Sequence, residues 1–445
     1  MKKEQINRRT FVKASSLAAG GIMLSGPLAA KAHNSVDDTI KVGLIGCGGR
    51  GTGAIVQALN SGQNVKLVAM ADAFKDRLDK CYDYINDGEF TDWSSGEAVD
   101  VSERIDVAEE HKFVGFDGYK KVIPLVDVII LTTPPGFRPI HFEAAVKAGK
   151  HIFTEKPMAV DAPGVRKVLA AAEEAKKKKL NVVVGLQRRY QKIYTNWVEA
   201  MHEGAIGDIV TSHVYWNSGG VWVRPREEGQ TEMEYQMRNW YYFNWLCGDH
   251  INEQHIHNID VSNWVKDAYP TKAYGMGGRH MRTGKDHGEI FDHHFVEFEY
   301  EDGAKMFSQC RHWKGTASRV TESFQGTNGS APKPGVLKTN SGYTLMRYND
   351  KKDPNPYQVE HNELFEAIAK GEYKFADAEH GAKSTMTAIL GRMATYSGQV
   401  VTWEEAINSK VDLLPEEFSW TAKPKILPKP DGTYPVPVPG VTKVV

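Results

Sequence analysis

The residues best suited to move a proton lie in the segment WLCGDHINEQHIHNIDVSNWV, residues 245–265. Within it, Glu253, His257 and Asp260 are four and three residues apart, which places them on one face if the segment is a helix. An imidazole titrates near neutral pH, so His257 could accept the proton of a hydroxyl group that is being oxidised. The spacing therefore predicts a helix that presents an acid–base group between two carboxylates.

Two other interpretations of this segment remain open. His257 could be a hydrogen-bonded histidine of the core. Alternatively, the region could bind a metal ion, because His250, Glu253, His255 and His257 are followed later by the Asp-His-His run at 292–294. On one helix, however, His250, His255 and His257 do not share a face, whereas zinc usually takes three or four converging ligands. We therefore expect no metal site.

A glycine-rich turn near the start of the chain indicates a nucleotide site. An apolar run over residues 40–45 precedes it and a helical pattern follows it, which is the order of a dinucleotide-binding unit. The turn contains Gly46, Gly48, Gly49 and Gly51. A second strand ends at Asp72, whose carboxylate could accept both hydroxyls of an adenosine ribose and would repel a 2′-phosphate. The pattern predicts NAD rather than NADP, although Lys75 and Arg77 follow closely.

Two later turns should lie at the same edge of the sheet. A buried strand over residues 126–131 leads into Thr-Thr-Pro-Pro at 132–135, and a short strand over residues 151–154 leads into Glu-Lys-Pro at 155–157. In an open parallel sheet, ligands bind beyond the carboxyl ends of the strands. Both turns are therefore expected to face the nucleotide, although Lys156 taken alone could equally be a solvated surface charge.

The glycine-rich turn, the Thr-Thr-Pro-Pro turn with His141 and the Glu-Lys-Pro turn together resemble the Gfo/Idh/MocA oxidoreductases over about residues 40–403. The resemblance implies an α/β fold: an N-terminal Rossmann domain with a doubly wound parallel sheet, then an α+β domain with a large open, mainly antiparallel sheet. It also implies that Lys156 lies beside the nicotinamide, that His257 takes the substrate proton, and that Glu253 orients the substrate. The family pattern has aspartate where Glu253 stands.

These motifs and the resemblance give three sets of site residues. The catalytic set is Lys156, His257 and Glu253. The cofactor-binding set is Gly46, Gly48, Gly49, Arg50, Gly51, Asp72, Thr133, Pro134, His141, Glu155, Lys156, Gln187 and Arg188. The substrate-binding set is Lys156, Tyr190, Trp222, Arg238, Asp260 and His257.

Aromatic and arginine side chains crowd the stretch before the segment 245–265. They are Trp216, Trp222, Arg224, Arg226, Arg238, Trp240, Tyr241, Tyr242 and Trp245. Because the C–H faces of a pyranose pack on aromatic rings and arginine binds hydroxyl groups, this composition favours a carbohydrate or glycoside as substrate.

We therefore expect an NAD-dependent oxidoreductase that oxidises a ring hydroxyl, at C3 by preference, to a keto-sugar. The leading alternative is an NAD-dependent glycosidase, which begins with the same oxidation, eliminates the group at C1, adds water and reduces the ketone again. The carboxylate-x-x-x-His-x-x-Asp pattern at 253–260 favours the dehydrogenase. A non-enzymatic carbohydrate-binding protein or a metal-dependent protein is the third class.

The first 32 residues have the pattern of a twin-arginine export signal, with Arg8 and Arg9, an apolar stretch over residues 17–28, and small residues at Ala30 and Ala32. This route carries folded proteins, so a periplasmic enzyme could cross with NAD already bound. We therefore expect a cofactor that is held tightly and recycled in place.

The rest of the chain is acidic. Residues 1–32 carry six Lys or Arg and one Glu, so a net charge of −1 overall leaves −6 for the remainder, without basic blocks. This argues against nucleic acids and anionic membranes as partners. No later segment is long and apolar enough to span a bilayer, so we expect no stable membrane insertion after signal cleavage. The four cysteines form no Cys-x-x-Cys pair.

The expected domains are a signal peptide at 1–32, an NAD-binding Rossmann domain at 38–157, a substrate-binding α+β domain at 158–425 and an extended proline-rich tail at 426–445. A homo-oligomer formed through the C-terminal sheet is also expected from the resemblance.

Overall fold

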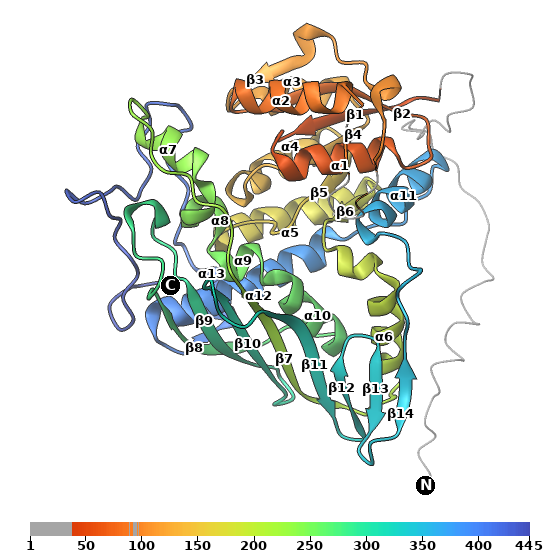
Figure 1. Cartoon of the computed structure of the whole chain (residues 1–445), viewed down its shortest axis with the longest axis vertical. Coiled ribbons are helices and arrows are strands. Elements are labelled where there is room, and N and C mark those ends of the chain that lie inside the picture. Colours follow the sequence, from red (N-terminus) through yellow and green to blue (C-terminus); the bar gives the residue numbers. More distant parts are fainter. Residues whose placement is uncertain (1–37, 89, 92–95, 97) are drawn as a thin grey trace, which may run out of the picture.

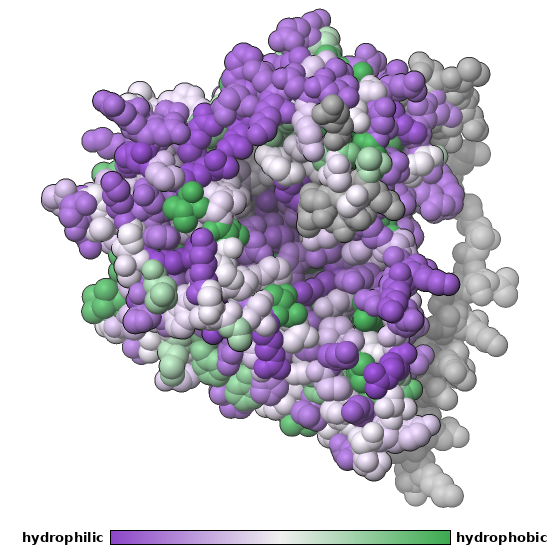
Figure 2. Space-filling model, in the orientation of Figure 1, coloured by the Kyte–Doolittle hydropathy of each residue, from purple (hydrophilic) through white to green (hydrophobic). Residues whose placement is uncertain are grey.

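The computed structural model describes residues 38–445 apart from residues 89, 92–95 and 97, so the predicted export signal lies outside the described residues. Two sheets form the molecule, one in each half of the view in Figure 1. The face in Figure 2 is mostly hydrophilic, with its apolar residues in small separate groups, and it is hollowed between the two halves. Among the described helices, none has the length and apolarity that crossing a membrane requires.

The first sheet is parallel throughout and has the strand order β3-β2-β1-β4-β5-β6. Its strands are β1 (Ile40–Ile45), β2 (Val65–Asp72), β3 (Lys112–Val114), β4 (Val128–Leu131), β5 (His151–Thr154) and β6 (Val182–Val184). The inner strands are apolar runs because helices cover both faces of the sheet. This order confirms the doubly wound Rossmann fold expected from the sequence.

Helices from distant parts of the chain cover the two faces of the parallel sheet. Those of the first half are α1 (Gly49–Leu59), α2 (Lys75–Asn86), α3 (Gly118–Val122), α4 (Arg138–Lys147) and α5 (Ala162–Lys177). One face packs on α3, α4 and α5, and the other on α1 and α2. The second face is completed by α11 (Pro356–Ala369), which returns from the C-terminal part of the chain.

The parallel sheet extends past residue 157, where the sequence pattern placed the domain boundary. Strand β6 pairs with β5 from Ile152 to Thr154, so the nucleotide-binding sheet includes residues up to Val184. The Glu-Lys-Pro turn suggested a boundary because it follows β5. The apolar run after α5, however, forms strand β6 and pairs with β5 in the first sheet.

The second sheet has nine strands in the order β14-β13-β12-β11-β7-β10-β9-β8-β15, and all its described pairs are antiparallel except β7 with β10. Its strands are β7 (Ile209–Ser218), β8 (Lys272–Gly278), β9 (His293–Glu299), β10 (Lys305–His312), β11 (Arg319–Gly326), β12 (Gly329–Lys333), β13 (Val336–Thr339), β14 (Thr344–Arg347) and β15 (Val401–Thr402). The expected alternation holds in β9, where Val296 and Phe298 are buried.

The remaining described α-helices follow β6 in the chain, and some of them supply residues to the candidate site. They are α6 (Lys192–His202), α7 (Glu232–Arg238), α8 (Asn244–Cys247), α9 (His250–Glu253), α10 (Ile256–Lys266), α12 (Ala378–Ser397) and α13 (Trp403–Asn408). Both α10 and α12 pack on one face of the nine-stranded sheet. After α13 the described chain contains no helix or strand, so the irregular tail begins well before residue 426.

The single helix expected over residues 253–264 is interrupted. Helix α9 ends at Glu253 and α10 begins at Ile256, with Gln254 and His255 between them. Here the His255 N–H donates to the carbonyl of His250, five residues back, at 3.1 Å, in place of the regular bond four residues back. Glu253 and His257 therefore come from two short helices that meet at an angle.

Candidate active site

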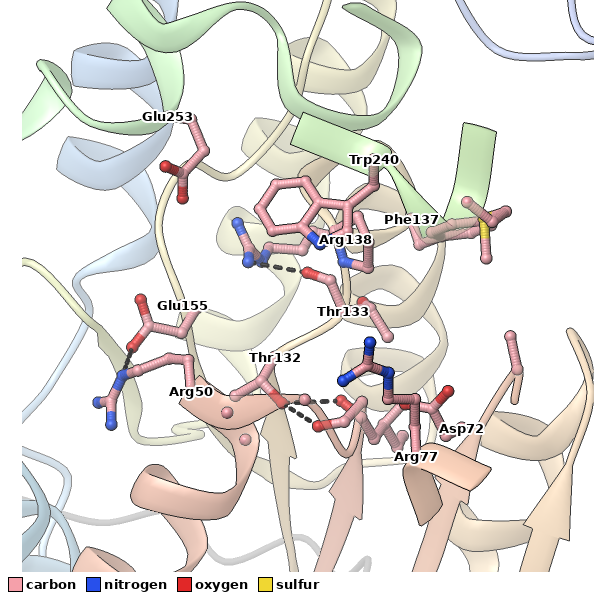
Figure 3. A pocket seen from close by; sticks show the side chains of 18 of the residues that line it. Arg50, Asp72, Arg77, Thr132, Thr133, Phe137, Arg138, Glu155, Trp240 and Glu253 are labelled. Atoms are coloured by element: carbon pink, nitrogen blue, oxygen red, sulfur yellow. Dashed lines mark hydrogen bonds and ion pairs between the residues drawn. The ribbon is translucent and has the colours of Figure 1, made fainter. Parts of the chain in front are cut away.

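A cavity of about 650 Å³ lies between the two sheets, at the carboxyl ends of β1, β2, β4 and β5. In Figure 3, Asp72, Arg77 and Thr132 reach it from the nucleotide domain, while Glu253 and Trp240 enter from the other domain. Its size falls in the range of small-molecule sites, and its position is where open α/β sheets bind ligands.

The glycines of the glycine-rich turn serve two purposes: two of them allow a close approach of the backbone, and two leave space for a ligand. Gly46 has a φ of +100°, and a Cβ there would lie 2.6 Å from the Thr133 nitrogen; a Cβ on Gly51 would lie 2.0 Å from the Gly46 carbonyl oxygen. Nothing lies within 4 Å of a Cβ on Gly48 or Gly49. These two positions open onto the start of α1, where a pyrophosphate could approach backbone N–H groups, so the turn fits a dinucleotide.

Asp72 is oriented by the backbone at the end of β2. Its carboxylate accepts hydrogen bonds from the N–H groups of Cys47 (2.7 Å) and Phe74 (2.8 Å). Burial raises the pKa of Asp72, although these two N–H groups act against the rise. Arg77 lies beside Asp72 and lines the same cavity. The carboxylate is thus fixed where the ribose of an adenosine would lie.

Arg50 and Glu155 bind each other at the opposite side of the glycine-rich turn. The Arg50 Nε atom lies 2.5 Å from a Glu155 carboxylate oxygen, and its Nη2 lies 3.3 Å from Glu360 of α11. Gly185 makes room for this pair, since a Cβ there would lie 2.8 Å from Glu155 Oε1. The pair ties the glycine-rich turn to the Glu-Lys-Pro turn, so the two turns are held in register.

Lys156 and Glu253 join the two domains inside the cavity. Lys156 Nζ donates to the Glu253 backbone carbonyl at 2.8 Å and to its carboxylate oxygen Oε1 at 3.1 Å. The Lys156–Pro157 peptide bond is cis. Both side chains are nearly buried but line the cavity, so the ammonium group is fixed in direction while it stays in reach of a ligand.

His257 presents a neutral ring to the same cavity. Burial holds its pKa well below the usual value, and the nearby positive charge of Lys156 adds to the shift. The ring stacks on Trp216, with 5.8 Å between the ring centroids, and its Nδ1 atom has no hydrogen-bond partner among the described residues. An unprotonated imidazole is the form that can accept a proton.

Most of the residues selected from the sequence line this cavity. They are Gly46, Gly48, Gly49, Arg50, Gly51, Asp72, Thr133, Pro134, His141, Glu155, Lys156, Gln187, Trp222, Arg238, Glu253 and His257. The nucleotide-side residues meet in one cavity because they follow the ends of parallel strands, which lie at one edge of the sheet.

Three selected residues are placed elsewhere. Arg188 forms a buried ion pair with Glu322, and the Tyr190 hydroxyl donates to Asp377 at 2.6 Å. Asp260 accepts two hydrogen bonds from Arg189, at 2.8 and 2.9 Å. It lies three residues beyond His257, about 4.5 Å along the helix axis, and has passed the cavity. These three side chains, which were expected to contact cofactor or substrate, form ion pairs or hydrogen bonds with other residues of the protein and do not line the cavity.

Arg138 is a cavity residue that the sequence analysis missed. It donates to the Thr133 carbonyl at 2.8 Å and to the Pro157 carbonyl, and therefore links the Thr-Thr-Pro-Pro turn with the Glu-Lys-Pro turn. Burial lowers its pKa to about 10. Its position could have been predicted, because Arg138 begins the helix that follows the turn at the carboxyl end of β4. Burial likewise lowers the pKa of His141 to about 3, and its Nδ1 contacts the Thr133 hydroxyl at 3.2 Å.

Helix α7 closes the adenosine end of the cavity. Arg238 makes two hydrogen bonds to Asp76 of α2, at 2.7 and 2.8 Å, and its guanidinium lies 3.8 Å from the centre of the Phe74 ring. The ring of Trp420, in the irregular C-terminal segment, also packs here, with its centroid 4.9 Å from that of Phe74 and 4.6 Å from that of Phe116. Arg238 therefore lies near Asp72 and not beside Lys156, where a substrate residue would be expected.

Comparisons with known proteins agree with this arrangement. Residues 40–185 match the Gfo/Idh/MocA family model, described as an oxidoreductase family with an NAD-binding Rossmann fold. The inositol 2-dehydrogenase of Serratia proteamaculans is 27% identical over 300 residues, covering 64% of this chain and 80% of the relative. That of Azotobacter vinelandii is 26% identical over 375 residues, covering 81% and 95%.

Solved structures share the fold at lower identity. The scyllo-inositol dehydrogenase of Lactobacillus casei with NAD(H) and scyllo-inositol has a TM-score of 0.59 at 17% identity, covering 82% of this chain and 99% of its own. A levoglucosan dehydrogenase in complex with NADH and levoglucosan has a TM-score of 0.61 at 14% identity, again covering 82% and 99%.

Proposed function

Since this chain belongs to the Gfo/Idh/MocA family and is an NAD-dependent oxidoreductase, we propose that it oxidises a ring hydroxyl of a sugar or glycoside to a keto-sugar. The observation that carries the proposal is the meeting of Lys156 and His257 in one cavity, the first an ammonium held by Glu253 and the second a neutral base. Alcohol oxidation needs both groups, since a proton must leave the hydroxyl as its oxygen gains carbonyl character.

Each protein group has a separate part in the reaction. Bound NAD supplies a hydride acceptor, and the glycine-rich turn, Asp72 and the two strand-end turns would hold it. His257 accepts the hydroxyl proton, while Lys156 Nζ donates a hydrogen bond to the same oxygen and stabilises its developing negative charge. Glu253 positions Lys156 through two hydrogen bonds. The stacking of Trp216 fixes the plane of the His257 ring.

A carbohydrate substrate is supported by the aromatic lining of the second domain. Trp216, Trp222 and Trp240 all line the cavity, and they come from the substrate-side domain that also supplies His257. The relatives in the comparison are named for inositol, and a structural neighbour for levoglucosan, which are polyhydroxylated rings. A flat, hydroxyl-rich ring could stack on these indoles while one hydroxyl points to Lys156.

We place the oxidised hydroxyl at C3 for a steric reason. In a pyranoside, C2 is adjacent to the carbon that bears the aglycone and C4 is adjacent to the carbon that bears the hydroxymethyl group. The C3 hydroxyl alone is flanked on both sides by ring carbons that bear only a hydroxyl group. It can therefore reach the enclosed pair Lys156 and His257 while the aglycone points out of the cavity.

The deciding experiment incubates stoichiometric NAD-loaded enzyme with a panel of glycosides, follows the absorbance of reduced nicotinamide and analyses the products. A keto-glycoside with its glycosidic bond intact supports the dehydrogenase. Free unoxidised sugar with released aglycone, and no net change in the cofactor, overturns it in favour of the glycosidase. A purified protein without dinucleotide and without NAD binding on titration would refute both.

We also propose that the enzyme is exported to the periplasm by the twin-arginine route with its cofactor bound, on the strength of Arg8, Arg9 and the apolar stretch that follows. The closed adenosine end of the cavity supports tight retention of NAD, and a second substrate would then return the hydride. Fractionation of cells tests the location: cleaved protein in the periplasm that depends on Arg8 and Arg9 is expected, and cytoplasmic accumulation would contradict it.

Subunit contacts are proposed at the outer face of the nine-stranded sheet. On β8, Tyr274 and Met276 are 52% and 62% exposed, while the alternate residues Ala273 and Gly275 are buried. Exposed apolar side chains on a flat sheet suit a self-complementary contact. Light scattering should give an oligomer for the natural chain and a smaller species for Tyr274→Lys; a monomeric natural chain would refute the contact.

A further inference from the structure

A second group of donor atoms lies behind the cavity, inside the substrate-side domain. Asp249, His250 and His294 do not line the cavity and are buried. Asp249 Oδ1 lies 2.8 Å from His250 Nδ1 and 3.2 Å from His294 Nε2, and one donor atom from each residue lies within 4.8 Å of the others. The set joins the turn between α8 and α9 to strand β9.

The hydrogen-bond pattern around His294 fixes which ring nitrogen carries its proton. The Thr395 hydroxyl donates to the Arg392 carbonyl at 3.0 Å, so its oxygen accepts from His294 Nδ1 at 2.9 Å. With one ring proton on Nδ1, Nε2 presents a lone pair to the carboxylate oxygen of Asp249 at 3.2 Å. Two lone pairs at this distance repel each other unless a metal ion or a second ring proton lies between them.

Other buried nitrogens around the set also lack partners. His250 Nε2 and both ring nitrogens of His312 have no hydrogen-bond partner among the described residues. The ring centroid of His250 lies 4.4 Å from that of His312 and 4.9 Å from that of His294. Buried polar atoms are normally satisfied, so this concentration of imidazole nitrogens beside a carboxylate suits a bound cation.

Asp249 is held in place for such a role. It has a φ of +70°, a conformation that a residue with a side chain seldom adopts and that surrounding contacts must enforce. Its second oxygen accepts from the Phe291 N–H at 2.9 Å and from the Tyr396 hydroxyl. These contacts, together with Thr395 behind His294, are the kind of outer partners that orient metal ligands.

We propose that Asp249, His250 and His294 bind one Zn²⁺ ion in a buried structural site. Two imidazoles and a carboxylate are ligands that zinc takes, and bonds of about 2.0–2.1 Å in a tetrahedral arrangement separate neighbouring donors by roughly 3.3 Å, close to the separations already present. The His312 ring, whose centroid lies 4.4 Å from that of His250, could supply the fourth donor. The ion would pin the first residue of α9, whose last residue, Glu253, holds Lys156.

The sequence argument against a metal considered one helix only. His250, His255 and His257 do not converge, but His294 arrives from a strand more than 40 residues later and completes a different set with Asp249. Convergence across two elements cannot be seen from helical spacing.

The test measures metal in the purified full-length protein after treatment with EDTA and gel filtration. We expect about one zinc ion per chain, because a fully buried ion is protected from the chelator. His294→Gln should reduce the zinc content at least tenfold, whereas His213→Gln, which removes a histidine of the same sheet on β7, should leave it unchanged. Retention of zinc by the His294 variant would overturn the assignment.

A second measurement does not depend on the variant folding. The natural chain produced with Co²⁺ in place of Zn²⁺ should show the visible absorption of a tetrahedral cobalt site with imidazole ligands. Protein that contains no stoichiometric metal, takes up neither ion after unfolding and refolding in its presence, and shows no change in melting temperature would refute the site. His294 would then be protonated on both nitrogens.

Discussion

The contact between Arg238 and Asp76 allows the retention of NAD to be tested at a defined bond. Arg238→Ala removes two hydrogen bonds to Asp76 and the packing of the guanidinium on Phe74. The ion pair is largely exposed at Asp76 and contributes only about 0.2–1 kcal/mol. The cation–π contact adds about 0.5–1 kcal/mol. If α7 must leave Asp76 before NAD can leave the cavity, the loss of roughly 1–2 kcal/mol should speed NAD dissociation ~5–30-fold.

The matched variant is Asp76→Asn, which weakens the ion pair but keeps Phe74 under the guanidinium. Its loss of roughly 0.2–1 kcal/mol should speed dissociation only ~1.5–5-fold. Dissociation is measured by displacing bound NADH with excess NAD and following the fluorescence of the reduced form. The same rate in the natural chain and in Arg238→Ala, with equal cofactor content, would refute the idea that α7 retains the cofactor.

The pair also predicts a dependence on pH. The hydrogen bonds from Arg238 lower the pKa of Asp76 below its usual 3.8. A carboxylate whose pKa is lowered by a contact stabilises that contact above its ordinary pKa, and this contribution disappears as the pH falls through the lowered value. The rate of NAD release should therefore be constant between pH 5 and 8 and rise only in strong acid. A rise between pH 7 and 6 would point to a histidine instead.

Three further predictions concern the reaction and the cofactor site. His257→Ala should lower the rate of hydride transfer about 10²–10⁴-fold while NAD stays bound, because a general base contributes about this factor; full activity with a normal rate would place the proton acceptor elsewhere. Because burial holds the pKa of His257 well below 6.5, the acid limb of kcat/KM should lie below pH 6.5; a midpoint above pH 7 would contradict a buried neutral base. Gly48→Val should abolish NAD binding with little change in melting temperature, because the new side chain would enter the open space where the pyrophosphate would bind. Gly51→Ala should instead destabilise the domain, because its Cβ would lie 2.0 Å from the Gly46 carbonyl oxygen. Calorimetry of both variants separates the loss of binding from the loss of stability.

The nucleotide half of the site could be predicted from the sequence because its determinants are local. A strand, a glycine-rich turn and an acidic residue at the next strand end are close in sequence, and parallel strands bring their carboxyl ends to one edge. The same reasoning predicted that Glu155 and Lys156 face the cavity, which they line because they directly follow β5.

The other half of the site depends on contacts that spacing does not reveal. Asp260 was expected beside His257, but it lies about 4.5 Å further along the axis of α10, and its carboxylate binds Arg189 and does not line the cavity. Arg238 was expected to bind substrate, yet its partner Asp76 lies 162 residues earlier. Ion pairs between distant segments decide where long side chains point, and a single sequence does not identify those partners.

Helix α11 has a consequence for how the enzyme acquires its cofactor. The glycine-rich turn is among the first described parts of the chain to be synthesised, but Glu360, which meets Arg50 of that turn, follows 310 residues later. The helix that carries Glu360 also covers one face of the parallel sheet. Until α11 has been synthesised, Arg50 lacks its contact with Glu360 and part of one face of the parallel sheet lacks its cover. We therefore expect the complete nucleotide site to form only after most of the chain has been synthesised.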